Sequence, residues 1–224
     1  YIADLKAEIA QNEQCATHYY NLGLALLTKR DFVAAEEALL NAVRNSPHLA
    51  EAYVQLGGIC LERGDLDGCL RYNEEAANCR AKFPVPWGNI AFVHLQRGEP
   101  DKAITALNKA LKWDPNFVQA RNALSTAYYM KGDFAACETA CKEVIKQQPG
   151  FAPAWNNLAL AQFEMEQYAD AAESAKKAQA LALHLNFVSK KTVRQRLLAY
   201  LEYMRDHAGA STFYVGRSLS WLAD

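Results

Sequence analysis

The chain has 224 residues, of which 51% are hydrophobic and 22% are charged, and its formal net charge at pH 7 is −1. This near-neutral balance gives no reason to expect nucleic acid or an anionic membrane as the partner of the whole chain. No apolar run approaches the ~18 residues needed to cross a bilayer, and no basic start followed by an apolar stretch predicts a signal peptide. We therefore expect a cytoplasmic protein, although the sequence begins at Tyr1 and an upstream signal or anchor would change that expectation.

Residues 1–15 form the first predicted helix. Ile2, Leu5 and Ile9 recur at spacings of three and four residues, as on the buried stripe of an amphipathic helix. The period found in the rest of the chain, carried backwards, would place this helix as the second helix of a preceding unit. It is therefore either a partial repeat or an N-terminal cap.

A unit of 34 residues then recurs five times without an insertion, over residues 16–49, 50–83, 84–117, 118–151 and 152–183. A large side chain is followed three places later by an aliphatic one and then at once by a small one, and further small residues recur in the second half. The first three of these columns are Tyr19, Tyr53, Trp87, Arg121 and Trp155; Leu22, Leu56, Ile90, Leu124 and Leu158; and Gly23, Gly57, Ala91, Ser125 and Ala159.

Helix breaks are predicted in the middle of each unit. Gly64, Gly98 and Gly132 can adopt the left-handed backbone that ends a helix, whereas Arg30 and Glu166 stand at the same position in the other two units. An aspartate that can cap the next helix follows in three units. These aspartates are Asp31, Asp65 and Asp133.

At these columns the sequence resembles the tetratricopeptide repeat family, whose unit is a helix, a tight turn and a second helix. The resemblance covers residues 16–183 and implies an all-α, right-handed superhelical solenoid of five repeats with flanking terminal helices. The physics of the unit agrees, because two short amphipathic helices cannot cover each other's apolar stripes and each pair must pack against the next pair.

Four of the six cysteines occupy small-residue or apolar positions of the repeat: Cys60, Cys69, Cys137 and Cys141. Such cysteines usually pack as small hydrophobic residues. Cys137 and Cys141 are four residues apart, a spacing that a metal could use, but no second pair of ligands lies near them in the sequence. We expect core packing, no metal site and a reducing compartment.

Catalytic motifs are missing from the sequence. The five histidines are scattered, and no metalloprotease helix motif, nucleophile elbow or phosphate-binding glycine loop occurs. We therefore expect a protein that is not an enzyme, with no catalytic residues and no cofactor.

Residues 184–224 break the period and form a basic, helical tail. From residue 185 onward, six Lys and Arg residues stand against three Asp and Glu residues, which gives +3. One interpretation is a helix that covers the last apolar face of the array, with Val193, Leu197, Leu201 and Met204 turned inward.

The other interpretation of the tail comes from a second resemblance. The run from Ser189 to Leu201, and then residues 212–224, resemble the opening of the C-terminal DNA-binding domain of Crp/Fnr-type bacterial regulators. Only that opening is present, because the recognition helix that enters the major groove in that family would follow Asp224. DNA binding is therefore not carried over to this chain as it stands.

The tetratricopeptide resemblance implies that the first helices line a concave groove. Amides recur just after the large column, and an amide can donate and accept at once, so a row of them can hold an extended peptide backbone. Apolar residues follow one turn later, and if several are exposed, the groove would favour an amphipathic helix or a peptide with hydrophobic anchors. The predicted groove residues are Tyr20, Asn21, Leu24, Gln55, Asn89, Phe92, Asn122, Tyr129, Asn156, Asn157, Leu160 and Phe163.

The sequence thus predicts a non-catalytic protein-interaction scaffold that binds a peptide or helix of a partner protein. The family's clamp for a C-terminal carboxylate is disfavoured, because these positions offer tyrosine, leucine, phenylalanine and asparagine where that clamp needs lysine and arginine. Two alternatives stay open: a bacterial regulatory protein whose tail belongs to a DNA-binding module, and an assembly factor of an envelope complex.

Overall fold

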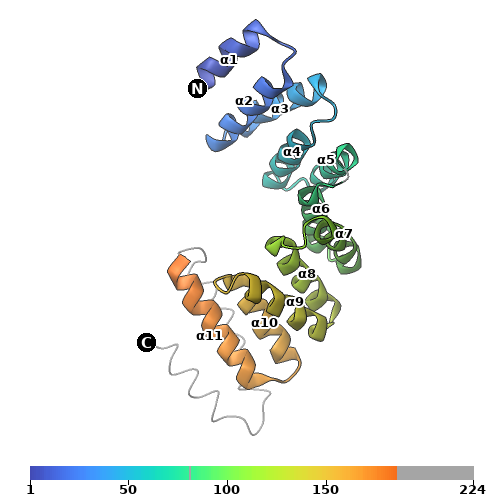
Figure 1. The fold of residues 1–224 in the computed structure, drawn as a ribbon, viewed down its shortest axis with the longest axis vertical. Helices are drawn as coiled ribbons and strands as arrows, with labels where there is room; N and C mark the ends of the chain where they lie inside the picture. Colours follow the sequence, from blue (N-terminus) through green and yellow to red (C-terminus); the bar gives the residue numbers. More distant parts are fainter. Residues whose placement is uncertain (81, 186–224) are drawn as a thin grey trace. The chain divides into compact units, whose positions relative to one another are not determined.

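The computed structural model describes residues 1–80 and 82–185, and the regular structure in these residues is entirely α-helical (Figure 1). The predicted Crp/Fnr-like run and the other tail residues from 186 to 224 lie outside the described residues, whereas residues 184 and 185 belong to the last helix. The helices are α1 (Ile2–Gln11), α2 (Ala16–Thr28), α3 (Phe32–Asn45), α4 (Ala50–Glu62), α5 (Leu66–Cys79), α6 (Pro84–Gln96), α7 (Pro100–Trp113), α8 (Val118–Lys131), α9 (Phe134–Gln147), α10 (Ala152–Glu164) and α11 (Tyr168–Leu185).

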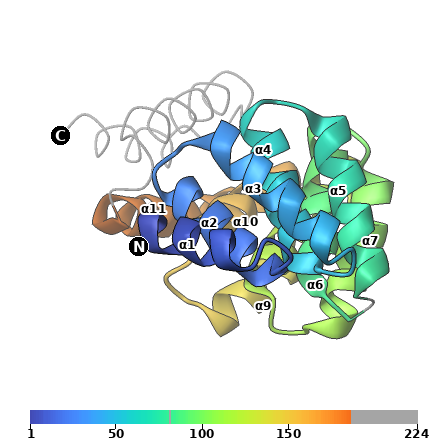
Figure 2. The same ribbon diagram turned by 90° about the horizontal axis from the view of Figure 1, so that it is seen from above.

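The chain divides into two compact units, Tyr1–Ala123 and Leu124–Asp224, so that α8 begins in the first unit and ends in the second. In the first unit α2 pairs with α3, α4 with α5 and α6 with α7, and α1 packs against α2. Figures 1 and 2 show α1, α2 and α3 side by side. In the second unit α10 packs against both α9 and α11. The all-α class and the repeated helical hairpin are confirmed.

The small-residue column lets the two helices of a hairpin approach closely. A Cβ atom at Gly23 would lie 2.7 Å from Cγ of Leu39, and Leu39 itself is fully buried. The small residues of the second helices are equally enclosed, since Ala35, Ala42 and Ala103 are all 0% exposed. The core is therefore a ribbon that follows the hairpins, as expected for a repeat protein.

Two members of the large column, Arg121 and Trp155, close the turn that precedes their helix. Trp155 donates its indole N–H to the carbonyl oxygen of Pro149 at 2.8 Å, and Arg121 donates from Nη2 to the carbonyl oxygen of Pro115 at 2.6 Å. Each donor stands six residues after its acceptor. An arginine can thus replace the aromatic residue in the fourth repeat because both side chains carry an N–H group at their far end.

The predicted caps and cysteine environments are confirmed. Asp31, Asp65 and Asp133 each accept a hydrogen bond from a backbone N–H three residues later, at 2.8–3.2 Å. The four cysteines expected in the core are buried, and they are free thiols: Cys60, Cys69, Cys137 and Cys141. Hydrogen bonding to Cys141 and burial together raise the pKa of the Cys137 thiol.

The turn position between paired helices requires a left-handed backbone whichever residue occupies it. Gly64, Gly98 and Gly132 have φ angles of 76°, 71° and 80°, and Arg30 and Glu166 adopt 60° and 62° in the other two repeats. The arginine and glutamate are held there by the hairpin although a side chain disfavours this conformation.

Two glycines with equally open surroundings separate backbone effects from packing effects. A Cβ atom at Gly98 or at Gly58 would meet no other atom within 4 Å, but only Gly98 has a positive φ. We expect Gly98→Ala to lower the free energy of unfolding by about 1 kcal/mol and Gly58→Ala, inside α4, to raise it by about 0.5–1 kcal/mol. Denaturant titrations followed by circular dichroism would measure both, and changes of the same sign would contradict the prediction.

Candidate peptide-binding groove

Each first helix of the first unit buries one side against its neighbours and leaves another side open. On α4, Leu56 and Ile59 are 1% exposed whereas Leu61 is 36% exposed. On α6, Val93 is fully buried whereas the adjacent Phe92 is 41% exposed. Because the repeats keep one register, the open sides of α2, α4 and α6 correspond, and we call them the groove face of the first unit.

The groove face is apolar and has a gap at its middle repeat. Leu24 on α2 and Phe92 on α6 occupy one column of the repeat, and α4 has Gly58 in that column. Gly58 is exposed, and the space that a Cβ atom would enter there is open. Leu61 lies one turn further along α4. The arrangement leaves room for an apolar side chain from outside the molecule.

Asn89, one of the predicted amides, is engaged within the fold. Its Nδ2 donates to Oδ1 of Asn73 on α5 at 2.9 Å, and Asn73 in turn donates to the carbonyl oxygen of Cys69 at 2.8 Å. Asn73 is 0% exposed, and the predicted site does not include it. The sequence does mark this position, because Asn73 stands where two other repeats have a leucine, Leu39 and Leu107.

Asn157 also contacts the preceding repeat, although its partners lie on the first helix of that repeat. Its Nδ2 donates to the hydroxyl oxygens of Ser125 and Thr126 on α8, both at 3.1 Å. Ser125 is 0% exposed and belongs to the small-residue column. The amide column therefore joins each of these first helices to the preceding repeat.

The aromatic members of the predicted site in the second unit also have partners within the fold. The hydroxyl of Tyr129 donates to Oε1 of Glu164 on α10 at 3.0 Å, and its ring lies 5.5 Å from that of Phe134. The ring of Phe163 lies 5.5 Å from that of Tyr168. Burial, followed by the hydrogen bond to Glu164, raises the pKa of Tyr129 to about 12.

The remaining predicted residues are partly exposed on first helices. In the first unit, burial raises the pKa of Tyr20, and the nearby Glu51 charge adds to that effect, while Gln55 lies within hydrogen-bonding reach. The structure groups the predicted set by unit and leaves all of its members accessible to some degree. The first unit holds Tyr20, Asn21, Leu24, Gln55, Asn89, Phe92 and Asn122, and the second holds Tyr129, Asn156, Asn157, Leu160 and Phe163.

Within residues 1–80 and 82–185, no group of three or more His, Cys, Asp or Glu side chains is placed to hold a metal ion. In the same residues, no helix combines the length and the apolar character needed to span a membrane.

Hairpins stacked in register, with apolar first-helix faces left open, define a helical-repeat protein of the protein-binding class. The chain belongs to the tetratricopeptide repeat family, whose models match residues 2–50 and 20–81, 94–158 and 152–184. Members of this family bind other proteins or peptides, and they typically act as scaffolds without catalytic activity.

Two known proteins are similar in sequence to part of this chain. It is 25% identical over 122 residues to the Arabidopsis thaliana tetratricopeptide repeat domain-containing protein PYG7, chloroplastic, covering 53% of this chain and 40% of that protein. It is 29% identical over 101 residues to the Bos taurus BBSome complex member BBS4, covering 45% and 19%. The chain thus spans less than half the length of these relatives.

One solved structure shows the same fold over most of both chains. The crystal structure of YrrB, described as a TPR protein with an unusual peptide-binding site, matches with a TM-score of 0.66 at 20% identity. The match covers 82% of this chain and 98% of that one.

The buried Asn73 makes Asn89 a stabilising residue. We expect Asn89→Ala to lower the free energy of unfolding by about 1–3 kcal/mol, because it removes the donor to a fully buried amide oxygen. Asn73→Leu, which restores the residue of the first repeat, should recover most of that loss when combined with Asn89→Ala. Chemical denaturation of the single and double variants would measure the coupling, and additive losses would contradict it.

Tyr129 gives the second unit an alkaline sensitivity. The pKa of Tyr129 in the folded protein lies above the ordinary tyrosine value, so the stabilisation is complete below about pH 10 and is lost as the pH rises towards 12. We expect the melting temperature of Tyr129→Phe to decrease less between pH 10 and pH 12 than the melting temperature of the wild type. Glu164→Gln should give a smaller change of the same sign, and parallel curves for all three proteins would contradict the assignment.

Proposed function

We propose that the groove face of the first unit binds one amphipathic segment of a partner protein, with apolar side chains of that segment as anchors. The observation that carries this proposal is the open space over Gly58, with Leu61 exposed on the same helix and Phe92 exposed on the next one. Monomeric surfaces usually avoid exposing large apolar side chains together, and such groups are typical of binding sites.

The amides have a supporting part in this proposal. Nδ2 of Asn89 and Nδ2 of Asn157 already donate within the fold. A row of amides that hold a peptide backbone, as the sequence predicts, would therefore rely on their remaining polar atoms and on Asn21 and Gln55. We assign the larger part of the binding energy to the apolar anchors, because burying one leucine-sized side chain contributes about 1.5–3 kcal/mol.

An amphipathic helix fits this face better than an acidic peptide tail. The side chains that form the groove face include Tyr20, Leu24, Leu61 and Phe92, and the charged neighbours Glu51 and Glu62 are acidic. A helix that presents residues at positions i, i+3 or i+4 and i+7 can place successive anchors along such a face.

Filling the gap tests the proposal. Random 16-residue peptides displayed on phage would be selected against the intact chain, and recovered peptides would be measured against variants by fluorescence anisotropy. We expect apolar residues at helical spacing in the recovered peptides, and at least about tenfold weaker binding by Gly58→Leu and by Phe92→Ala.

The melting temperature of Gly58→Leu serves as the control for unfolding. Since the space above Gly58 is open, Gly58→Leu should fold with unchanged or higher melting temperature, so that lost binding reports the site and not unfolding. Recovered peptides that bind the wild type and both variants equally well, or a selection that recovers none, would refute the groove as the binding site.

A further inference from the structure

Two hollows in the molecule are copies of one another. Each is lined by the second helix of one repeat and by both helices of the next, and every lining position of the first has its counterpart 68 residues later in the second. The Trp87 pocket lies between α5, α6 and α7 and has a volume of about 500 Å³; the Trp155 pocket lies between α9, α10 and α11 and has a volume of about 370 Å³. Both volumes are in the range of ligand sites.

These pockets lie on another side of the first helices than the groove face. Trp87, Ile90 and His94 follow one another at spacings of three and four residues, and they line the pocket together. Phe92 stands two positions after Ile90, which is about 200° around the helix. A ligand in the Trp87 pocket would therefore contact a different side of α6 than a ligand in the groove.

Each pocket sets a lysine over the face of its tryptophan. Nζ of Lys109 lies 4.1 Å from the ring centroid of Trp87, and Nζ of Lys177 lies 4.7 Å from that of Trp155. A tryptophan recurs with a lysine 22 residues later in these two repeats, whereas the aligned pairs elsewhere are Tyr19 with Asn41, Tyr53 with Glu75 and Arg121 with Glu143. The indole face attracts the ammonium group and holds it at the pocket.

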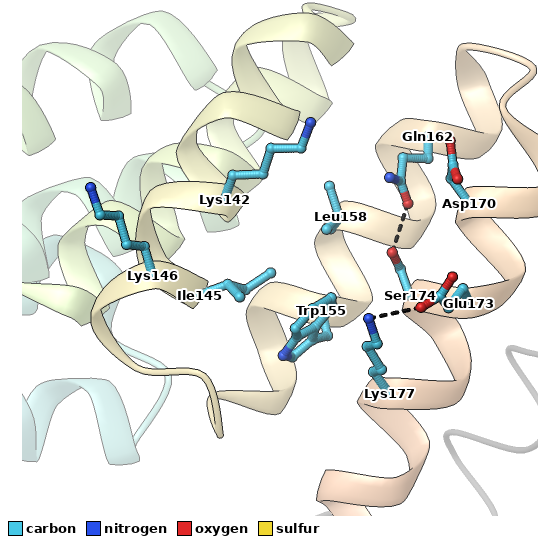
Figure 3. A pocket seen from close by; sticks show the side chains of 10 residues that line it. All are labelled: Lys142, Ile145, Lys146, Trp155, Leu158, Gln162, Asp170, Glu173, Ser174 and Lys177. Atoms are coloured by element: carbon cyan, nitrogen blue, oxygen red, sulfur yellow. Dashed lines mark hydrogen bonds and ion pairs between the residues drawn. The ribbon is translucent and has the colours of Figure 1, made fainter.

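The Trp155 pocket supplies its own carboxylate to that lysine. Figure 3 shows Glu173 beside Lys177, and the two groups form an ion pair of 2.9 Å. Deeper in the same pocket the hydroxyl of Ser174 donates to Oε1 of Gln162 at 2.8 Å. Four of the polar side chains that line this pocket are therefore paired with one another.

The Trp87 pocket lacks the corresponding carboxylate. Thr105 stands where the other pocket has Glu173, and Lys109 forms no ion pair with any residue of the described ranges. Two other basic groups on this side share one acid, since His94 and Lys102 both contact Glu99, at 2.7 and 3.0 Å. The carboxylate in the lining itself is Glu74, which stands on the α5 wall whereas Lys109 stands on α7.

We propose that the Trp87 pocket binds a polypeptide segment in which an acidic side chain adjoins an apolar one. The apolar side chain would rest on Trp87 and Ile90, and the carboxylate would pair with Lys109, as Glu173 pairs with Lys177 in the other pocket. Glu74 on the opposite wall repels a carboxylate and so fixes the direction in which the segment lies.

The test uses the intact chain and two short probes, acetyl-Leu-Glu-amide and its uncharged counterpart acetyl-Leu-Gln-amide. The indole N–H signals of the ¹⁵N-labelled protein report each tryptophan separately by NMR, and Trp87→Phe assigns the signal of the pocket. We expect the Glu probe to shift the Trp87 signal with about fivefold higher affinity than the Gln probe, the preference that one partly exposed ion pair gives.

Three variants separate the proposed contact from general binding. Lys109→Gln should abolish the preference for the Glu probe, and Thr105→Glu should weaken its binding, because the introduced carboxylate would take the position of the ligand's carboxylate. Lys177→Gln, the matched change in the other pocket, should leave the Trp87 response unchanged. Equal affinity for the two probes, a larger shift at Trp155, or no shift at Trp87 up to about 20 mM probe would overturn the proposal.

Discussion

The close contact between the two helices of each hairpin is the constraint on which the rest of the structure depends. It requires a residue without a bulky side chain on the first helix, and the requirement is strict where the neighbour is large. A Cβ atom at Gly57 would lie 2.3 Å from Nδ2 of Asn73, closer than real atoms approach. With the helices held at this distance, each hairpin presents the same two sides to its neighbours, and the register carries from one repeat to the next.

Because the register is fixed, a residue that differs from its counterparts in the other repeats can be compared with them directly. Asn73 is a buried amide in a column of leucines, and it persists because Asn89 and Cys69 satisfy it. Arg121 stands among aromatic residues because it makes the same backbone contact as Trp155. Thr105 is different, because it stands where the fifth repeat has Glu173, and Lys109 therefore keeps its contact with the Trp87 ring but has no counterpart of the Glu173–Lys177 ion pair in the described part of the chain. Departures with an internal compensation stabilise the fold, whereas the exposed Lys109, which has no ion pair among the residues that the structure describes, is the group to which we propose that a ligand binds.

Most of the fold follows from the sequence because its determinants are local and repeated. The second repeat, predicted over residues 50–83 with a helix break at Gly64, contains the helices Ala50–Glu62 and Leu66–Cys79 on either side of that break. The caps and left-handed turns depend on one residue and its immediate neighbours, so their positions could be read directly.

The candidate sites could be predicted only in part, for a physical reason. Helical periodicity shows which side of a helix is polar, but it does not show whether a given amide donates inward or outward. The sequence placed Asn89 and Asn157 beside the groove, and only the packing of adjacent repeats reveals their contacts with Asn73 and Ser125. The contact between Lys109 and Trp87 likewise joins residues on two helices, and no local motif predicts it.

Helix α6 brings the two proposed sites together in one element. Its thirteen residues include no Lys, Arg, Asp or Glu, and apolar side chains occur all around it. Such a helix is expected in the interior of a protein, yet Phe92 is 41% exposed on one side of α6, and the Trp87 pocket opens on another. One side of α6 packs against the preceding hairpin, where Val93 is fully buried in a cluster with Cys60 and Cys69. The remaining apolar sides exceed what the hairpin needs, and binding of partner segments would account for both of them.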